Sequence, residues 1–148
     1  MEAKKIDDLV FKKLNELRDR IAANIKSTNS SASGMSSQSM VITREQTRQT
    51  LSARPFFATL ETGRRPGKMP PISKMLEFLA ARQIQMEGVS NLKRAWGTAI
   101  NISKFGTKLF QKGGRKDIYT NEIEKFKTEI YKEVKDALIL IVKDELKR

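Results

Sequence analysis

The segment 63–68 is the part of the chain whose residue types most invite a chemical interpretation. It reads Gly-Arg-Arg-Pro-Gly-Lys, and glycines beside basic residues can cradle a phosphate, because free N–H groups and cations converge on it. A phosphate-binding loop, however, has four residues between its glycines and a Ser or Thr after the Lys. Here three residues separate the glycines, and Met69 follows the Lys. We therefore interpret the segment as a rigid loop whose Arg64, Arg65 and Lys68 are either solvated or docked on carboxylates or phosphates of a partner.

A second group of basic residues lies between 104 and 116. It surrounds two phenylalanines, Phe105 and Phe110, and a Gly-Gly pair at 113–114. Basic residues interleaved with aromatic rings can bind single-stranded nucleic acid, because the rings stack on bases and the cations contact phosphates. The interpretation that we favour is that both rings pack inward while the lysines stay in water. The basic residues of this group are Lys104, Lys108, Lys112, Arg115 and Lys116.

The residue types that most enzymes use are missing or isolated. The chain has no cysteine and no histidine, which excludes disulfides, zinc sites of the Cys/His kind and nucleophiles activated by histidine. Glu61 stands alone in a basic segment and is expected to pair with a nearby arginine, whereas the carboxylates after residue 121 alternate with lysines. We expect no catalysis, no cofactor and no metal. An enzyme acting on DNA through a metal held by carboxylates is the enzymatic alternative.

The net charge of the chain is strongly positive and unevenly distributed. Its 148 residues carry 29 basic and 17 acidic side chains, a net charge of +12. By segment, the net charge is +2 over 1–26, +4 over 27–70, +7 over 71–116 and −1 over 117–148. We therefore expect an acidic partner, either a nucleic acid or an acidic protein surface. We expect no membrane span and no export signal, because the longest apolar run, 137–142, has six residues against about 18 for a span.

The elements that must position these residues begin with a long helix over 2–26. Apolar residues recur every three or four positions from Ile6 to Ile25 and form one narrow stripe. The segment 27–40 has seven serines, one glycine and no charge, which predicts a flexible loop that can order against a neighbour. The segment 41–53 is compatible with a strand or with a short helix.

Two central helices are predicted next. The first runs over 71–85, and the second begins at a cap on Ser90 and ends at Gly106. The stretch 109–120 is expected to form a tight turn or a small hairpin. The apolar residues expected to face inward on the second helix are Leu92, Ala95, Trp96, Ala99 and Ile100.

The last predicted element is a long helix over 121–148. Asn121 and Glu124 have the spacing of a helix cap and its return partner. The run 137–142 within it is apolar on more than one face. Such a run indicates either a contact between subunits or a helix end buried in the chain's own core.

Together these elements predict a helix-rich α+β fold. Long N- and C-terminal helices enclose two central helices, which we expect to pack on a small antiparallel sheet or hairpin. We expect a single domain over 1–148. Its parts are the N-terminal helix 1–26, the Ser-rich loop 27–40, the core 41–120 and the long C-terminal helix 121–148.

The block 53–71 combines several short features in a recognisable order. The aromatic pair Phe56-Phe57 precedes the step Leu60-Glu61-Thr62-Gly63, and the basic Pro/Gly loop 64–68 then leads through Pro70-Pro71 into a helix. Together with the later stretch 96–119, this block resembles a family of tailed-bacteriophage neck proteins, the tail-completion or head–tail joining proteins. The likeness covers about residues 53–120.

The resemblance implies a structural virion protein without catalytic activity. It implies an α+β protomer that forms a ring around the DNA channel, between the portal or its adaptor and the tail. The expected partners are other copies of this chain, portal, adaptor or tail proteins, and passing DNA, with no membrane and no small-molecule substrate. The expected contact residues are Phe56, Phe57 and Leu60 as apolar anchors, together with Arg64, Arg65 and Lys68. The alternative function is a small basic protein that binds nucleic acid on its own.

Overall fold

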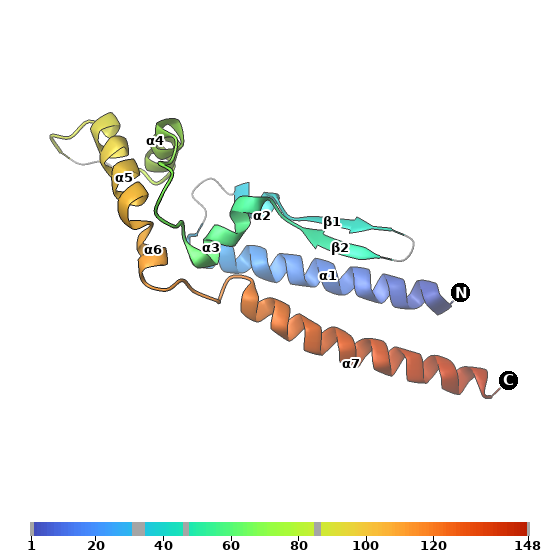
Figure 1. The fold of residues 1–148 in the computed structure, drawn as a ribbon. Helices are drawn as coiled ribbons and strands as arrows, with labels where there is room; N and C mark the ends of the chain where they lie inside the picture. The colour runs from blue at the N-terminus through green and yellow to red at the C-terminus, as the bar shows by residue number, and fades with distance from the viewer. Residues whose placement is uncertain (1, 31–34, 46–47, 85–86, 148) are drawn as a thin grey trace.

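The computed structural model describes residues 2–30, 35–45, 48–84 and 87–147. The fold is helix-rich α+β, as predicted, with long N- and C-terminal helices and one small antiparallel sheet (Figure 1). The first half contains α1 (Glu2–Ser27), α2 (Met35–Gln38), β1 (Val41–Arg44), β2 (Gln49–Ser52), the 3-10 helix η1 (Pro55–Ala58) and α3 (Thr59–Thr62). The second half contains α4 (Ile72–Ala81), α5 (Asn91–Phe105), α6 (Lys108–Gln111) and α7 (Thr120–Glu145).

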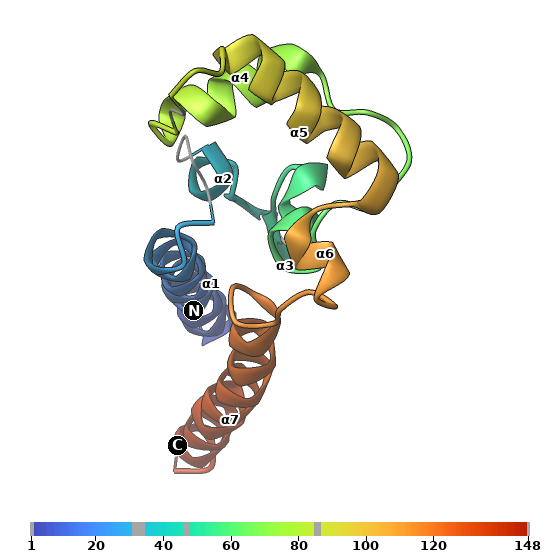
Figure 2. The same ribbon diagram turned by 90° about the vertical axis from the view of Figure 1, so that its left-hand side faces the viewer.

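The molecule is elongated, with α1 and α7 side by side at one end and α4 and α5 at the other (Figures 1 and 2). The apolar stripe predicted on α1 is buried along Leu14, Leu17, Ile21 and Ile25, where it meets the first turns of α7 and the segment before them. Ion pairs join the two helices on their polar sides, including one at 3.6 Å between Arg20 and Glu122. Arg20 lies 2.9 Å from Glu129, and Lys13 lies 2.8 Å from Glu133.

The segment 41–53, which the sequence left open between strand and helix, forms a β-hairpin. Val41 pairs with Ser52 and Arg44 with Gln49 in antiparallel register. The hairpin lies along α1 (Figure 1), where Gln49 donates a 2.7 Å hydrogen bond to the carbonyl of Asp7. The sheet therefore packs on the N-terminal helix, while α4 and α5 pack on each other. This arrangement differs from the expected packing of the two central helices on the sheet.

The Ser-rich segment is more ordered than a simple loop. Residues 31–34 lie outside the described part, but 35–38 form the short helix α2, with Ser36 buried. Met40 follows and joins the core beside Leu17, Ile21 and Ile25. The prediction of a flexible loop over the whole of 27–40 is therefore wrong, because Met40 within the segment packs on α1.

The second central helix follows its predicted caps closely. The Ser90 hydroxyl accepts a 3.3 Å hydrogen bond from the backbone N–H of Lys93, and Gly106 ends α5 with φ of +76°. The first central helix is shorter than predicted, because the chain leaves helical geometry at Arg82 and Gln83, whose φ is +51°. Leu79 of α4 and Ala95 and Ala99 of α5 are the residues that this helix pair buries.

The small hairpin predicted as one alternative for residues 109–120 does not form. Residues 108–111 form the helical turn α6, capped by the Thr107 hydroxyl, which accepts a 3.4 Å hydrogen bond from Phe110 N–H. Gly113 and Gly114 follow with φ of +83° and +82°. Two consecutive left-handed residues redirect the chain toward α7 without pairing two strands.

Candidate interaction surfaces

Glu61 connects the predicted basic loop to the start of α7. Its side chain is 3% exposed, and Oε1 accepts hydrogen bonds from the backbone N–H groups of Ile118 (2.9 Å), Tyr119 (2.7 Å) and Thr120 (3.0 Å). The hydroxyl of Thr120 donates to Oε2. Thr120 is the first residue of α7, and its N–H belongs to the unpaired first turn, where the helix dipole favours a negative charge. Ile118 and Tyr119 directly precede the helix. Glu61 therefore supplies a cap for α7 from a distant part of the chain.

This arrangement corrects two expectations about carboxylates. Glu61 does not form its main contacts with an arginine, because its oxygens are occupied by the start of α7, and Arg115 instead pairs with Asp117 at 2.6 Å. The cap of α7 is not made by Asn121 and Glu124, because the helix begins at Thr120 without a cap from its own preceding side chain. Local sequence patterns carry no signal for a cap whose donor and acceptor lie 57–59 residues apart.

The loop 63–71 is held against the junction between α5 and α6 by its backbone. The carbonyl of Arg64 accepts from Thr107 N–H at 2.9 Å, and Gly67 N–H donates to the carbonyl of Ser103 at 2.8 Å. Gly106 has φ of +76°, and a Cβ added there would stand 2.7 Å from the Arg64 carbonyl oxygen. The close approach of two backbones therefore requires glycine at 106, and it gives the loop a fixed position on the α4–α5 pair.

The basic side chains of this loop differ in their availability. The guanidinium of Arg64 donates a 2.9 Å hydrogen bond to the carbonyl of Lys68, so it is used within the loop. Arg65 and Lys68 are exposed. Of the three cations expected to contact a partner, these two present their charge outward.

The fold brings the two predicted basic segments together at one cavity of about 510 Å³. Arg65 comes from the loop after α3, whereas Arg115 and Lys116 come from the turn before α7. The remaining lining residues are Glu61, Thr62, Phe110, Gly113, Gly114, Tyr119 and Thr120. The predicted basic residues Lys104, Lys108 and Lys112 are exposed on α5, on α6 and just after α6, outside this lining.

The two phenylalanines of the second basic segment have different environments. Phe110 is half-buried and lines the cavity, whereas Phe105 is 59% exposed at the end of α5. The expectation that both rings pack inward is therefore wrong for Phe105. That residue ends α5 beyond the part of the helix that α4 covers.

The three predicted apolar anchors of the block 53–71 have different environments. Phe57 and Leu60 pack against the chain's own core, and the Phe57 ring lies 5.6 Å from the ring of Tyr119 between centroids. Phe56 is the exposed member of the three. Only this ring is offered at the surface as an apolar contact for a partner.

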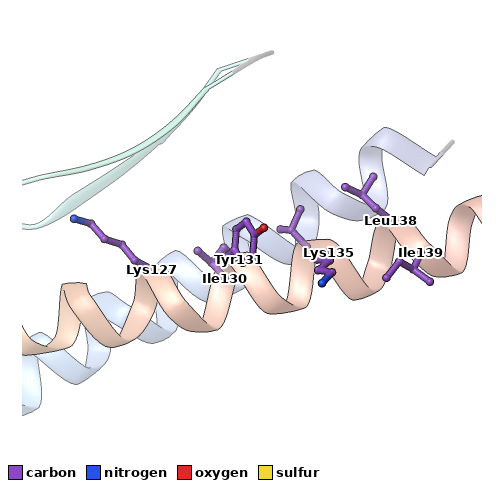
Figure 3. Close-up of a pocket in the computed structure, with 7 residues that line it drawn as sticks. Lys127, Ile130, Tyr131, Lys135, Leu138 and Ile139 are labelled. Carbon is purple, nitrogen blue, oxygen red and sulfur yellow. The ribbon is translucent and has the colours of Figure 1, made fainter.

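One side of α7 is apolar and uncovered along much of its length (Figure 3). Tyr131 is 74% exposed, and Leu138 and Val142 are also exposed on the same side. The open groove along this side is lined by residues of α7: Lys127, Ile130, Tyr131, Val134, Lys135, Leu138 and Ile139. We call the surface formed by Tyr131, Val134, Leu138 and Val142 the α7 face. Of the two interpretations of the run 137–142, burial in the chain's own core does not hold for Leu138, Ile139, Leu140 and Val142.

A second uncovered apolar surface lies on α5. Leu92, Trp96 and Ile100, which the sequence placed inward, are exposed, with Trp96 at 45%. We call these three residues the α5 face. The inward prediction is correct for Ala95 and Ala99 but wrong for the three large residues. The physical reason is that the ten-residue helix α4 covers one narrow side of α5, and small residues allow that close approach.

The perturbed ionisable groups of the molecule mark structural contacts. The pKa of Glu129 is lowered by its hydrogen bond with Arg20, and that of Asp7 is lowered by Gln49 and Arg44. The pKa of the Tyr119 hydroxyl is raised, first by burial and then by the charge of Glu61. Among the residues that the structure describes, no three His, Cys, Asp or Glu side chains are grouped as metal ligands. No helix of the described chain is long and apolar enough to cross a membrane.

Comparison of the chain with protein-family models, with curated proteins and with solved structures finds no match.

Proposed function

We propose that the chain is a structural subunit of the neck of a tailed bacteriophage particle, where copies form a ring between head and tail. The observation that carries this proposal is the pair of uncovered apolar surfaces, the α5 face and the α7 face, at opposite ends of an elongated subunit (Figure 1). Large exposed apolar surfaces mark places where other proteins bind. Two such surfaces on one subunit suit a chain that contacts a neighbour on either side, as ring subunits do.

The mechanism of such a subunit is mechanical. Copies dock by shape and charge on an existing acidic ring of portal, adaptor or tail proteins, and the excess positive charge speeds and orients the encounter. The loop 63–71 suits this role, because its backbone is fixed on the α5–α6 junction while Arg65 and Lys68 face outward. Rigid presentation of charge lowers the entropy lost on docking.

The experiment that tests this proposal is quantitative mass spectrometry of purified tailed particles from cells that carry this sequence. Peptides of this chain are counted against those of the most abundant coat protein. A few to about a dozen copies per particle support a neck ring, because closed rings of identical subunits have a small fixed number of members. Absence of the chain from particles would overturn the proposal.

The alternative function, binding of nucleic acid by the chain alone, is favoured by one observation. Arg65 and Lys116, from segments about 50 residues apart, line a single cavity beside Phe110, together with Arg115, whose guanidinium pairs with Asp117. A protein that neutralises phosphates in this way loses affinity steeply as salt rises, because counterions are released on binding. Fluorescence anisotropy with a labelled oligonucleotide at increasing salt tests it. An affinity without salt dependence, or no binding at low salt, excludes this function.

A further inference from the structure

The α5 face and the α7 face cannot cover each other within one chain. The α5 face lies at the α4–α5 end of the molecule, and the α7 face extends along the C-terminal helix at the other end (Figure 1). A second copy placed end to end brings an α5 face onto an α7 face. In that arrangement one kind of contact covers both surfaces of every subunit, whereas contacts between identical faces need two separate interfaces.

Charge disfavours a contact between two α5 faces. The segment 71–116, which contains α4, α5 and α6, has a net charge of +7, whereas the segment 117–148, which contains α7, has −1. A contact between two α5 faces therefore brings two strongly positive bodies together, which costs free energy at moderate salt. A contact between an α5 face and an α7 face sets the positive body against a segment of net charge −1, with two charged residues, Lys127 and Lys135, lining the groove along the α7 face.

The two surfaces also match in kind and in length. Leu92, Trp96 and Ile100 are spaced four residues apart on α5 and extend over about 12 Å at 1.5 Å per residue. Tyr131 to Val142 on α7 extends over about 16 Å by the same rise. Each surface includes an exposed aromatic residue of a type often found at the centre of protein contacts: Trp96 in the middle of the α5 face and Tyr131 at the N-terminal end of the α7 face.

We propose that the α5 face of one copy packs on the α7 face of the next copy, head to tail. This inference rests on the self-assembly part of the proposed function and names the surfaces through which it occurs. The contact is heterologous, because each subunit gives a different surface to each neighbour, and it closes into a ring when the rotation between copies permits.

The experiment uses one charged substitution in each face. Ile100→Asp disrupts the α5 face and Leu138→Asp disrupts the α7 face, and both positions are exposed, so far-UV circular dichroism should match the unchanged chain. Analytical ultracentrifugation measures self-association over a range of concentrations. Val41→Asp is the matched control, because it places the same charge on an exposed apolar residue outside both faces.

The expected result has three parts. The unchanged chain and the Val41→Asp chain form oligomers, whereas each face variant alone is weakened about 30-fold or more, as for a contact at the centre of an interface. An equal mixture of the two face variants forms dimers and nothing larger, because one supplies an intact α7 face and the other an intact α5 face. Trp96, the single tryptophan, shifts its emission to shorter wavelength as the contact buries it.

Three results would overturn the inference. Self-association of Ile100→Asp alone indicates contacts between two α7 faces, and self-association of Leu138→Asp alone indicates contacts between two α5 faces. An unchanged chain that stays monomeric at all concentrations has no such contact. The mass-spectrometry measurement on particles is independent of these results. If the protein forms head-to-tail oligomers but is absent from particles, only the proposed neck function is overturned. If the protein is present in particles but a face variant still self-associates, only this proposed contact is overturned.

Discussion

At the scale of single residues, Glu61 joins two segments that lie 57–59 residues apart in the sequence. It is buried in a basic segment, and its oxygens satisfy three backbone N–H groups and one hydroxyl at the start of α7. A buried carboxylate that is fully hydrogen-bonded stabilises the fold, whereas the same N–H groups left unpaired would destabilise it. Glu61 therefore stabilises the fold mainly because it pairs N–H groups that would otherwise lack a hydrogen-bond partner.

Substitutions of Glu61 should form a graded series. Glu61→Gln keeps an oxygen that can accept the three N–H groups and should cost about 1 kcal/mol, the loss of the charge. Glu61→Ala leaves the N–H groups unpaired and should cost about 3 kcal/mol or more. Urea unfolding followed by circular dichroism measures both. Glu77→Gln, in an exposed pair with Lys74, is the control and should change stability by less than about 0.5 kcal/mol. Equal effects of Glu61→Ala and Glu77→Gln would contradict this role for Glu61.

At the scale of elements, local signals in the sequence predict local structure well. The stripe of α1, the Ser90 cap and the end of α5 at Gly106 are all confirmed, because each depends on neighbours within a few residues. The cap of α7 by Glu61 was not predictable, because nothing near residue 61 or residue 120 indicates that the two segments meet. Local patterns find helices and their ends, but not caps supplied from elsewhere.

The candidate surfaces were predictable only in part, for a related reason. Periodicity identified Leu92, Trp96 and Ile100 as one apolar side of a helix, and this is correct. Periodicity does not say whether another element is available to cover that side. The short α4 covers Ala95 and Ala99 instead, and the large residues stay at the surface.

Two glycines of the α5 region should respond in opposite ways to the same substitution. Gly106→Ala forces a Cβ against the Arg64 carbonyl oxygen and the Phe110 ring at a positive φ, and should destabilise the chain by about 2 kcal/mol or more. Gly97→Ala lies inside α5 with no atom within 4 Å of the added Cβ, and should stabilise it by about 0.5–1 kcal/mol. Thermal unfolding of the two variants measures the difference. Equal melting temperatures would show that the loop and α5 do not approach as closely as described.

At the scale of the whole molecule, carboxylates paired with arginines should make stability depend on pH. Glu129, paired with Arg20 of α1, has a lowered pKa, as does Asp117 beside Arg115. The unfolded chain therefore binds protons at a higher pH than the folded chain does, so stability is present above the unfolded pKa values, near 4, and is lost as pH falls through the lower, folded values.

We expect the melting temperature to fall as pH decreases from about 5 toward 3, and Glu129→Gln should remove part of this fall. Circular dichroism melts at several pH values measure it. The control is Glu124→Gln, an exposed carboxylate on the same helix, which should leave the dependence unchanged. A melting temperature that is constant down to pH 3 would contradict the assignment.

The role in assembly that we propose for the outward charges of the loop can be tested by charge reversal. The sequence alone suggests reversing Arg64 and Arg65, but Arg64 is used within the loop, so Arg65→Glu with Lys68→Glu is the sharper pair. We expect this double variant to fold normally and to yield few infectious particles in a complementation assay. Lys12→Glu with Lys132→Glu changes the net charge equally on exposed sites of α1 and α7 and serves as the control. Full infectivity of the loop variant would exclude the loop as the contact.

The pairing of α1 with α7 also determines when the core can form during synthesis. Leu17 and Ile21 emerge from the ribosome early, but Ile118 and Phe126, which pack on the same cluster, lie about 100 residues later. At roughly 5–20 residues per second, the stripe of α1 waits on the order of 5–20 s for its partner. During that interval the part of the stripe that Ile118 and Phe126 cover is open to chaperones and to other nascent chains, so completion of the core waits for translation of the segment between the two helices.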